Sequence, residues 1–545
     1  MLSRPTRWGS VASTHFELRT VAPELAARYR AAGWWADTTV GAVAESGLAA
    51  LHDEDFVVHS QVRPWRGTFG EVDARGRALA GWLAARGVGV GDVVVLQLPN
   101  WMEAGVAFFA ATYLGAAVVP VVHFYGPKEV GYILRATEPA VVVTPDRFGH
   151  TDHLAMYDDL LTAHPDTLWL VAANASTELP RRAVALDTTF DHAPVAHATA
   201  VDPDSPALIG FTSGTTRDPK GVVHSHNTIL CETRQLAEMN SLPGPPGLTG
   251  APVGHFIGML GAFLMPLLRR EPVHLIDVWN PGEVLRIMRE EQVGVLGGAT
   301  FFLTSLLDHP DFSDEHRALM PYAGLGGAPI PASVAERLDA LGITMFRSYG
   351  STEHPSITGS PPTAPREKRL STDGCAMPGV ELRLDDDGQI VSRGPDLFLG
   401  YTDPELTATV FDDDGWYHTG DVGVLDDDGY LAITDRISDV IIRGGENLSA
   451  QEIEEQLLKV PGLAEVAVVA APDERLGEHA AAIVRVLDGT EAPTLDDVRV
   501  HLESVGLARQ KWPEELHVVT ELPRTASGKV QKFRLRQALR EGTIT

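Results

Sequence analysis

The sequence is poor in cysteine and in positive charge. Cys231 and Cys375 are the two cysteines among 545 residues, too few for a cysteine-based metal cluster. We expect both to be buried thiols in the reducing cytoplasm rather than a disulfide. Lysine and arginine number 44 against 73 aspartates and glutamates, which gives a net charge of −29. Because this charge repels nucleic acid and anionic membranes, a phosphate-bearing ligand has to be held by a local pocket.

Long hydrophobic segments are also scarce. Residues 104–122 are nearly all apolar, and the run is long enough to resemble a membrane span. Gly115 and Pro120 interrupt it, and the pattern fits a buried helix that leads into a buried strand. Residues 1–13 are polar and lack the apolar core of a secretory signal peptide. We therefore expect neither a transmembrane segment nor a signal peptide.

Helix and strand signals alternate along the first part of the chain. Helical patterns cover residues 23–32 and 68–86, and strand-like apolar runs cover residues 93–98, 118–122 and 140–144. Alternation at this spacing is typical of α/β proteins, in which helices cover both faces of a mostly parallel sheet. Since 545 residues are too many for one ordinary core, we expect two or more domains.

The most informative stretch is residues 208–227, which read LIGFTSGTTRDPKGVVHSHN. An apolar strand precedes a loop of hydroxyls and glycines that ends at Lys220 and Gly221. Such a loop can turn its N–H groups and hydroxyls toward phosphate oxygens, and Lys220 adds a positive charge. It is not a Walker loop, because Lys220 precedes Gly221. By composition alone a solvated hairpin turn is favoured, since turns use the same residue types.

The order of these residues resembles the phosphate loop of the adenylate-forming superfamily, Thr-Ser-Gly-Thr-Thr-x-x-Pro-Lys-Gly. This superfamily contains acyl-CoA synthetases, aryl-CoA ligases, luciferases and the adenylation domains of peptide synthetases. Arg217 departs from the pattern, because the family commonly has glycine there. The resemblance implies a set of nucleotide-binding residues in this loop: Thr212, Ser213, Gly214, Thr215, Thr216 and Lys220.

Further nucleotide contacts are implied by three downstream motifs. Residues 322–330 (YAGLGGAPI) resemble the segment that lies along the adenine, and residues 347–353 (RSYGSTE) contain the family's Tyr-Gly-x-Thr-Glu. The resemblance implies that Tyr349 stacks on the adenine, that Thr352 bonds the α-phosphate and that Glu353 binds Mg²⁺, which prefers oxygen ligands. Asp421 resembles the acceptor of both ribose hydroxyls. The residues implied at the base are Gly327, Ala328, Pro329 and Tyr349.

Three aspartate triplets, at residues 385–387, 412–414 and 426–428, superficially resemble metal clusters. Each lies beside glycine and between strand-like runs, and aspartate and glycine are typical of tight turns. We interpret all three as hairpin turns.

The C-terminal part contains the remaining motifs of the resemblance. Residues 435–439 match the family's hinge, in which Arg436 also reaches the nucleotide and Ser438 replaces the usual Asp or Lys. Gly444 and Gly445 resemble the loop that lines the pantetheine channel, and Lys529 resembles the catalytic lysine.

These motifs imply an N-terminal ATP- and acyl-binding domain of residues 1–435, a hinge at 436–439 and a mobile domain of residues 440–545. The expected fold is α/β. Its large domain has mostly parallel sheets covered by helices plus a β-barrel-like part, and its small C-terminal domain is α+β.

The acyl pocket is implied by two segments. Residues 252–258 (PVGHFIG) resemble a Pro-x-x-His-x-x-Gly segment that borders the pocket, although a strand end packed on a helix is an alternative. Residues 293–302 are expected to form a strand that ends in a second wall. The implied pocket residues are His255, Phe256, Gly258, Phe301 and Phe302. Because residues 252–258 contain no acidic side chain for an α-ammonium group, we expect a hydrophobic acid of open chain length.

The resemblance implies an AMP-forming acyl-CoA synthetase that uses ATP, Mg²⁺ and coenzyme A. Catalysis would rest on Lys529, Glu353 and Thr352, with Glu353 as the metal ligand. Two alternatives remain: an adenylation enzyme that loads a carrier protein, and a non-enzymatic acyl-nucleotide sensor, against which the presence of Asp421, Arg436 and Lys529 argues. The sequence leaves the oligomeric state open, a homodimer included.

The first prediction concerns Lys529. Lys529→Ala should lower the rate of acyl-adenylate formation by about 10²–10³-fold, because a charge that stabilises the transition state is lost. Thioester formation from supplied acyl-AMP should be largely spared. Pyrophosphate release and thioester formation, measured separately on one preparation, test this. Equal losses in both half-reactions would show that Lys529 is structural or serves both.

Overall fold

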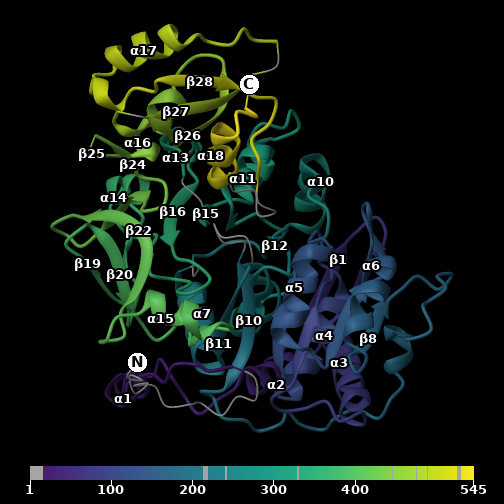
Figure 1. Cartoon of the computed structure of the whole chain (residues 1–545). Coiled ribbons are helices and arrows are strands. Elements are labelled where there is room, and N and C mark those ends of the chain that lie inside the picture. Colours follow the sequence, from purple (N-terminus) through teal and green to yellow (C-terminus); the bar gives the residue numbers. More distant parts are fainter. Residues whose placement is uncertain are drawn as a thin grey trace. The chain divides into compact units, whose positions relative to one another are not determined.

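The computed structural model describes residues 16–212, 219–239, 242–327, 330–444, 446–473, 475–487, 489–524 and 530–544. Contacts between residues divide the chain into two units (Figure 1). The first comprises residues 1–381 and 393–416, and the second comprises residues 382–392 and 417–545. Each unit contains its own sheets and hydrophobic clusters.

The main sheet of the first unit has eight strands in the order β21-β11-β10-β4-β3-β5-β8-β9. The strands from β10 to β9 pair in parallel, whereas β11 and β21 are antiparallel additions at one edge. The bounds are β3 (Val93–Leu96), β4 (Ala117–Pro120), β5 (Val141–Pro145), β8 (Leu168–Ala172), β9 (Ala183–Ala185), β10 (Pro206–Thr212), β11 (Lys220–Ser225) and β21 (Gly400–Tyr401). The valine-rich central strands are buried on both faces, as a parallel sheet covered by helices requires.

Helices alternate with these strands as predicted, and others precede the first of them. They are α1 (Pro23–Ala31), α2 (Val40–Ala50), α3 (Phe69–Ala84), α4 (Met102–Tyr113), α5 (Pro127–Thr137), α6 (His153–Leu160) and α7 (His226–Met239). Thr68 and Glu71 form a capping box at the start of α3. Every residue of α4 is buried, and α4 lies beside α3 against the sheet (Figure 1). The apolar run of residues 104–122 is therefore helix α4 and strand β4. Among the described residues, no helix combines the length and hydrophobicity needed to cross a membrane.

Besides the two-stranded pair of β6 (Arg147–Phe148) and β7 (Thr151–Asp152), two smaller sheets lie in the first unit. One has the order β12-β13-β1-β2, and the other has the order β14-β15-β16-β17-β18. Their strands are β1 (Asp55–His59), β2 (Trp65–Thr68), β12 (Leu248–Thr249), β13 (Val273–Ile276), β14 (Gly297–Gly298), β15 (Tyr322–Gly326), β16 (Thr344–Tyr349), β17 (Thr358–Gly359) and β18 (Cys375–Ala376). The accompanying helices are α8 (Phe256–Met259), a π-helical turn (Leu260–Leu264), α9 (Met265–Arg269), α10 (Pro281–Glu291), α11 (Thr300–Leu307), α12 (Asp314–Ala318), α13 (Ala332–Ala340), α14 (Arg366–Ser371) and α15 (Pro404–Val410).

The strand expected over residues 293–302 is mostly wrong. Only Gly297 and Gly298 form a strand, and Phe301 and Phe302 lie in helix α11. Gly298 adopts φ +124°, which ends the extended segment. Leu303, Leu306 and Leu307 then recur at helical spacing and are buried in the core.

The second unit contains most of an antiparallel sheet and a small α+β sheet. The first has the order β19-β20-β22-β23. The strands are β19 (Glu381–Leu384), β20 (Gln389–Arg393), β22 (Tyr417–Leu425), β23 (Leu431–Arg436), β24 (Ile441–Arg443), β25 (Glu446–Leu448), β26 (Leu463–Asp473), β27 (Gly477–Val486) and β28 (Glu515–Val518). The helices are α16 (Ala450–Leu457), α17 (Leu495–Ser504) and α18 (Lys532–Arg540). Alternate residues of β26 face α16 and α17 on one side and α18 on the other.

Contacts place residues 382–392 and 417–435 with the C-terminal residues, so the contact boundary differs from the predicted hinge at 436–439. The predicted hinge is a statement about the motion of one domain, and it stays a prediction.

The aspartate triplets form turns, because the amide N–H groups of Asp387, Asp414 and Asp428 donate to the carboxylate two residues earlier. In the described ranges, no three His, Cys, Asp or Glu side chains group as metal ligands. Both cysteines are free thiols, Cys231 buried and Cys375 half-buried.

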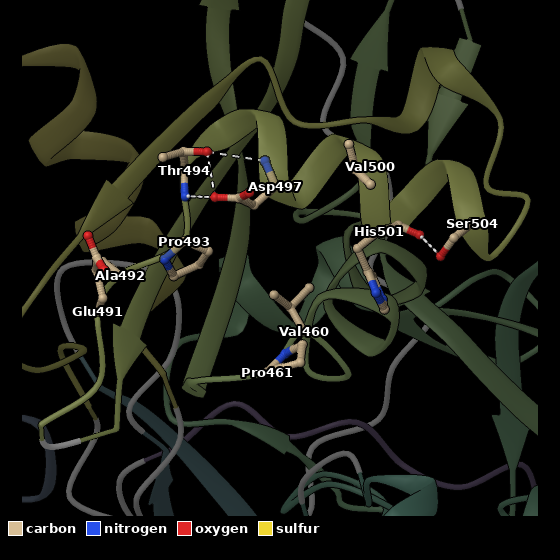
Figure 2. Close-up of a pocket in the computed structure, with 10 residues that line it drawn as sticks. All are labelled: Val460, Pro461, Glu491, Ala492, Pro493, Thr494, Asp497, Val500, His501 and Ser504. Carbon is tan, nitrogen blue, oxygen red and sulfur yellow. Dashed lines mark hydrogen bonds between the residues drawn. The ribbon is translucent and has the colours of Figure 1, made fainter.

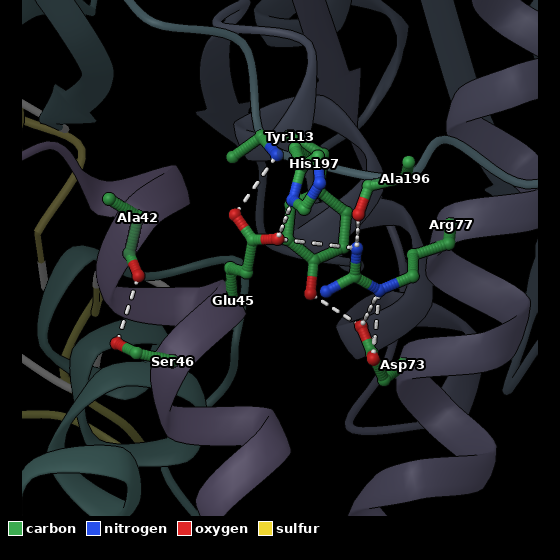
Figure 3. Close-up of polar contacts among 9 residues, drawn as sticks. Ala42, Glu45, Ser46, Asp73, Arg77, Tyr113, Ala196 and His197 are labelled. Atoms are coloured by element: carbon green, nitrogen blue, oxygen red, sulfur yellow. Dashed lines mark hydrogen bonds and ion pairs between the residues drawn. The ribbon is translucent and has the colours of Figure 1, made fainter.

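A polar network fixes the connection that leads into β10 (Figure 3). Arg77 pairs with Asp73 at 2.9 Å and donates to the carbonyl of Ala196 at 2.8 Å. Glu45 accepts from the amide of Ala198 and contacts the ring of His197. Burial opposes ionisation of Glu45, but these bonds and the charge of Arg77 outweigh it and lower the pKa of the carboxyl. The network therefore holds the connection on α2 and α3.

The second prediction tests this network. Arg77→Met keeps the aliphatic stem and removes the charge and its bonds. The free energy of local opening at residues 195–199 should fall by about 1–3 kcal/mol, because Arg77 bonds a carboxylate and a carbonyl in a half-buried setting. Hydrogen exchange of these amides measures it.

Arg286→Met is the matched control. Arg286 pairs with Glu283 and Glu290 on the solvent-facing side of helix α10, and we expect a change in exchange at residues 195–199 too small to measure. Equal exchange in the two variants would contradict a role for Arg77 in holding the connection.

Candidate functional site

Strands β10 and β11 form an antiparallel pair that closes the predicted phosphate loop. Thr212 at the end of β10 is the register partner of Lys220 at the start of β11. Ser213, Gly214, Thr215 and Thr216 lie outside the described residues. The structure thus fixes the two ends of the loop and places Thr212 beside Lys220.

Thr352 and Glu353 lie in a tight turn after β16. Gly350 permits this turn, because a Cβ there would lie 1.9 Å from the carbonyl oxygen of Pro355. His224 of β11 holds the turn with its Nε2 atom, 2.7 Å from the carbonyl oxygen of Thr352. Burial lowers the pKa of His224 to about 4, so the ring is neutral near pH 7. Since the carbonyl only accepts, Nε2 carries the proton and donates.

Glu353 is almost buried, with 9% of its surface exposed. The hydroxyl of Tyr401 donates to its Oε1 atom at 2.8 Å, and the amide of Phe398 donates to its backbone carbonyl at 2.9 Å. The ring of the same tyrosine lies 5.3 Å from Nζ of Lys220. Glu353, the predicted metal ligand, and Lys220, the predicted phosphate-binding lysine, therefore both contact the side chain of Tyr401.

A buried polar layer adjoins this turn. His354 pairs with Asp396 at 3.2 Å, and both are fully buried. Ser356 donates to Glu232 at 3.0 Å, and burial together with the charge of Asp396 raises the pKa of Glu232 well above its usual value. Asp396 therefore acts on both His354 and Glu232 and links the members of this layer.

The layer was missed by the sequence analysis. The single available signal was the position of His354 directly after Glu353. The other members come from distant parts of the chain.

Phe256 of the predicted acyl pocket and Thr352, the predicted α-phosphate residue, both contact Gly210 of strand β10. A Cβ at Gly210 would lie 2.9 Å from Cγ2 of Thr352 and 3.5 Å from the ring of Phe256. The rings of Phe256 and His224 are 5.1 Å apart. Half-buried His255 is the N-cap residue of α8, and Gly258 packs against the carbonyl of Pro252. Both Phe256 and Thr352 thus lie against Gly210.

The second predicted wall of the acyl pocket, Phe301 and Phe302, makes other contacts. Phe302 packs on Trp279, with ring centroids 4.5 Å apart, and on the core around it. Phe301 is 64% exposed. Within the described part of the chain, no ring contact joins Phe301 or Phe302 to Phe256. Of the three predicted pocket phenylalanines, Phe256 is the one that the described contacts place at Gly210.

The predicted base-binding segment is partly described. Gly327 adopts φ +79°, and a Cβ there would meet nothing within 4 Å, so the backbone is open to a flat ligand. Tyr349 is the buried last residue of β16. Ala328 and Pro329 lie outside the described residues.

In the second unit, Asp421 and Arg436 are register partners on β22 and β23. Nε of Arg436 lies 2.9 Å from Oδ1 of Asp421, which is nearly buried while Arg436 is half exposed. The two residues predicted to bind the nucleotide are thus adjacent and paired with each other.

Residues before and after the predicted hinge are bonded to each other in the second unit. Ser438 lies exposed in a turn. The hydroxyl of Ser449 donates to the carbonyl of Thr434 at 3.0 Å, and the amide of Ala450 donates to the carboxylate of Asp435 at 2.7 Å. Burial raises the pKa of Asp435. The start of α16 is therefore tied to the end of β23.

The ends of the predicted lysine loop are also pinned. Lys529 itself lies outside the described residues, as does Gly445. The amide of Gln531 donates to the carbonyl of Pro523 at 2.7 Å. Helix α18 is then anchored by Lys532 to Glu454 at 2.8 Å. In the predicted pantetheine loop, Gly444 adopts φ +62° and donates to the carbonyl of Leu476.

A hollow of about 510 Å³ lies beside α17 in the second unit (Figure 2). Its lining residues are Val460, Pro461, Glu491, Ala492, Pro493, Thr494, Asp497, Val500, His501 and Ser504. Thr494 and Asp497 form the capping box of α17, and His501 bonds the carbonyl of Gln456. These polar groups already bond atoms of helix α17 or its neighbour. The hollow contains none of the predicted site residues.

Two family models match the chain. The AMP-binding enzyme model matches residues 49–402, and the AMP-binding enzyme C-terminal domain model matches residues 452–529. The medium-chain fatty-acid–CoA ligase of Escherichia coli (strain K12) is 33% identical, over 94% of this chain and 92% of the relative.

Another relative, from Rhodococcus jostii (strain RHA1), is a propanoyl:CoA ligase whose acyl group carries a 7a-methyl-1,5-dioxo-octahydro-1H-inden-4-yl ring system. It is 35% identical, over 86% of this chain and 93% of the relative. Among solved structures, ATP-bound MatB from Rhodopseudomonas palustris aligns with a TM-score of 0.81 at 28% identity. That alignment covers 93% of this chain and 100% of MatB.

The third prediction concerns the hinge. Ser438→Pro fixes φ and removes one N–H, which should stiffen the turn. We expect adenylation to be retained and the thiol step to be lost, as measured by pyrophosphate release and thioester formation on one preparation. Ser438→Ala, which removes only the hydroxyl, is the control and should support both steps. If proline impairs the two steps equally, the hinge lies elsewhere.

Proposed function

Because the chain belongs to the family of AMP-binding enzymes, we propose that its residues activate a hydrophobic carboxylic acid with ATP and transfer the acyl group to coenzyme A. The chain is an AMP-forming acid–thiol ligase, an acyl-CoA synthetase. Its substrates are a carboxylic acid, ATP and coenzyme A, and its products are the acyl-CoA, AMP and pyrophosphate.

In the first half-reaction, a carboxylate oxygen attacks the α-phosphorus of ATP, and the bond to the β-phosphate oxygen breaks. The products are acyl-AMP and pyrophosphate. The barrier comes largely from bringing an anion onto a polyanion, so positioning and charge neutralisation are what the protein has to supply. We assign this positioning and charge neutralisation to the loop from Thr212 to Lys220, to Thr352 at the α-phosphate and to Lys529.

Mg²⁺ fits this arrangement with Glu353 as its protein ligand. Magnesium on a triphosphate is typically held by one or two carboxylates together with phosphate oxygens and water. The buried Glu353 carboxylate, oriented by Tyr401, provides one such ligand. When bound, the ion would neutralise charge on the phosphates.

In the second half-reaction, the sulfur of coenzyme A attacks the acyl carbon, and the bond to AMP breaks. The thiol proton leaves to solvent or to a base. We propose that rotation about Ser438 removes Lys529 and brings in Gly444 and Gly445, so that one site serves both steps. Asp421 and Arg436 would hold the ribose and nucleotide, with Asp421 exchanging its bond to Arg436 for the ribose hydroxyls.

The observation that carries the proposal is the contact at Gly210. The carboxylate of the acid and the α-phosphate of ATP must meet for the first step to occur. Phe256 and Thr352, the residues assigned to the two ligands, both pack against Gly210 of β10. This adjacency supports an acid-activating site rather than separate nucleotide and apolar sites.

The substrate is proposed to be a hydrophobic monocarboxylic acid. Phe256 is a buried apolar side chain against Gly210, Ile257 is half-exposed, and residues 252–258 contain no acidic side chain. The two relatives act on a medium-chain fatty acid and on a bicyclic propanoate. We extend this to aliphatic, alicyclic or aromatic acids of open length. We also propose a cytoplasmic location, to which the two free thiols are suited, and leave a homodimer to be tested by mass in solution.

The function is tested with purified protein, ATP, MgCl₂ and coenzyme A against octanoate, 3-cyclohexylpropionate and 3-phenylpropionate. Equal amounts of AMP, pyrophosphate and acyl-CoA support the proposal. Acyl-AMP without acyl-CoA would favour the carrier-protein alternative. ATP binding without pyrophosphate release for any acid would favour the sensor.

The fourth prediction concerns the charge of the substrate. A buried ammonium group without a counter-ion costs several kcal/mol, and each 1.36 kcal/mol corresponds to about tenfold. We expect kcat/KM for 3-phenylpropionate and 3-cyclohexylpropionate to exceed that for phenylalanine and cyclohexylalanine by at least about 100-fold. The pairs are compared at saturating ATP and coenzyme A. A preference for the amino acids would move the chain to the peptide-synthetase branch.

A further inference from the structure

Tyr401 occupies a position in the site that no sequence motif assigned. It is 2% exposed and lies on the two-residue strand β21, where it is the register partner of Val222 on β11. The amide of Thr402 donates to the carbonyl of Gly221 at 2.8 Å, and the amide of Leu399 donates to that of Val223 at 2.8 Å. The backbone around Tyr401 is therefore fixed against the strand that begins at Lys220.

The two ends of the Tyr401 side chain contact groups of opposite charge. Its hydroxyl donates to Oε1 of Glu353 at 2.8 Å, and its ring lies 5.3 Å from Nζ of Lys220. A hydrogen bond to a carboxylate is stronger than one between neutral groups, and an ammonium group is attracted to an aromatic face. Within the described residues, Lys220 and Glu353 do not form an ion pair, although both contact Tyr401.

We propose that Tyr401 is a positioning residue that holds the Glu353 carboxylate and the Lys220 ammonium group apart and oriented for a magnesium-bound triphosphate. A direct ion pair between these two would neutralise both before ATP binds. The ring prevents this pairing while attracting the cation, and the hydroxyl engages one carboxylate oxygen and sets the orientation of the other. The inference rests on the proposed function, because it assigns Glu353 to Mg²⁺ and Lys220 to phosphate.

The test measures ATP binding by calorimetry with MgCl₂ and with EDTA, in the absence of acid and coenzyme A. Tyr401→Phe keeps the ring and removes the hydroxyl. We expect the gain in ATP affinity caused by Mg²⁺ to fall about tenfold, which is the weight of one hydrogen bond to a charged group. ATP affinity in EDTA should stay unchanged. In Tyr401→Leu the ring is also lost, so affinity in EDTA should fall as Lys220 pairs with Glu353.

A double-mutant cycle separates positioning from a general structural role. If Tyr401 acts through Glu353, then Tyr401→Phe should have little further effect in the Glu353→Gln background. Tyr157→Phe is the matched control, because Tyr157 is also buried and donates to Gln97 at 2.7 Å elsewhere in the first unit. It should leave the magnesium dependence unchanged.

Three outcomes would overturn the inference. They are an unchanged magnesium dependence in Tyr401→Phe, additive effects in the cycle, and a melting temperature of Tyr401→Phe far below that of Tyr157→Phe. The last would show that the hydroxyl serves folding. Because the assay contains neither acid nor coenzyme A, a chain that forms no acyl-CoA would refute the proposed function without deciding the role of Tyr401.

Discussion

The register of strand β11 is the constraint on which the rest of the first unit's site depends. Its first residue, Lys220, pairs with Thr212 and so sets the two ends of the phosphate loop. Four residues later, on the same face, His224 bonds the carbonyl of Thr352. On its other edge, β11 pairs with β21 and so positions Tyr401 against Glu353. A shift of one residue would turn Lys220 and His224 to the opposite face and separate all of these contacts.

The turn that bears Glu353 is held from two sides by different chemistry. Glu353 bonds the hydroxyl of Tyr401, whereas the next residue, His354, pairs with the buried carboxylate of Asp396. Buried charges are costly unless paired, and Asp396 together with burial also raises the pKa of the neighbouring Glu232. Because a buried polar network permits few alternative arrangements, it suits a turn whose task is to hold a ligand in one geometry.

Local patterns predicted much of the fold and of the site. The strand-helix alternation, the start of a helix at Thr68 and the aspartate turns are short-range signals, and the structure confirms each of them. The strand at residues 293–302 was wrong, because two valines before a glycine pair look extended, whereas the apolar run after them packs as a helix. Tyr401, Asp396 and Glu232 could not be found, since their partners lie far away in the sequence and a single residue carries no pattern.

The hydrogen bonds around Ser438 determine how much free energy the proposed rotation requires. In this structure Thr434 and Asp435 bond Ser449 and Ala450, so a swivel at Ser438 has to break both hydrogen bonds. Each is worth about 0.5–1.5 kcal/mol net, and somewhat more for the bond to the Asp435 carboxylate. The sum is a few kcal/mol, which is the differential affinity that a bound ligand has to supply to reverse a two-state equilibrium. Ser438 carries no charge that would add to this barrier. The amides of Asp439 and Val440 also donate to the carbonyl of Arg436 across Ser438, so these bonds add to the free energy that the ligand has to offset.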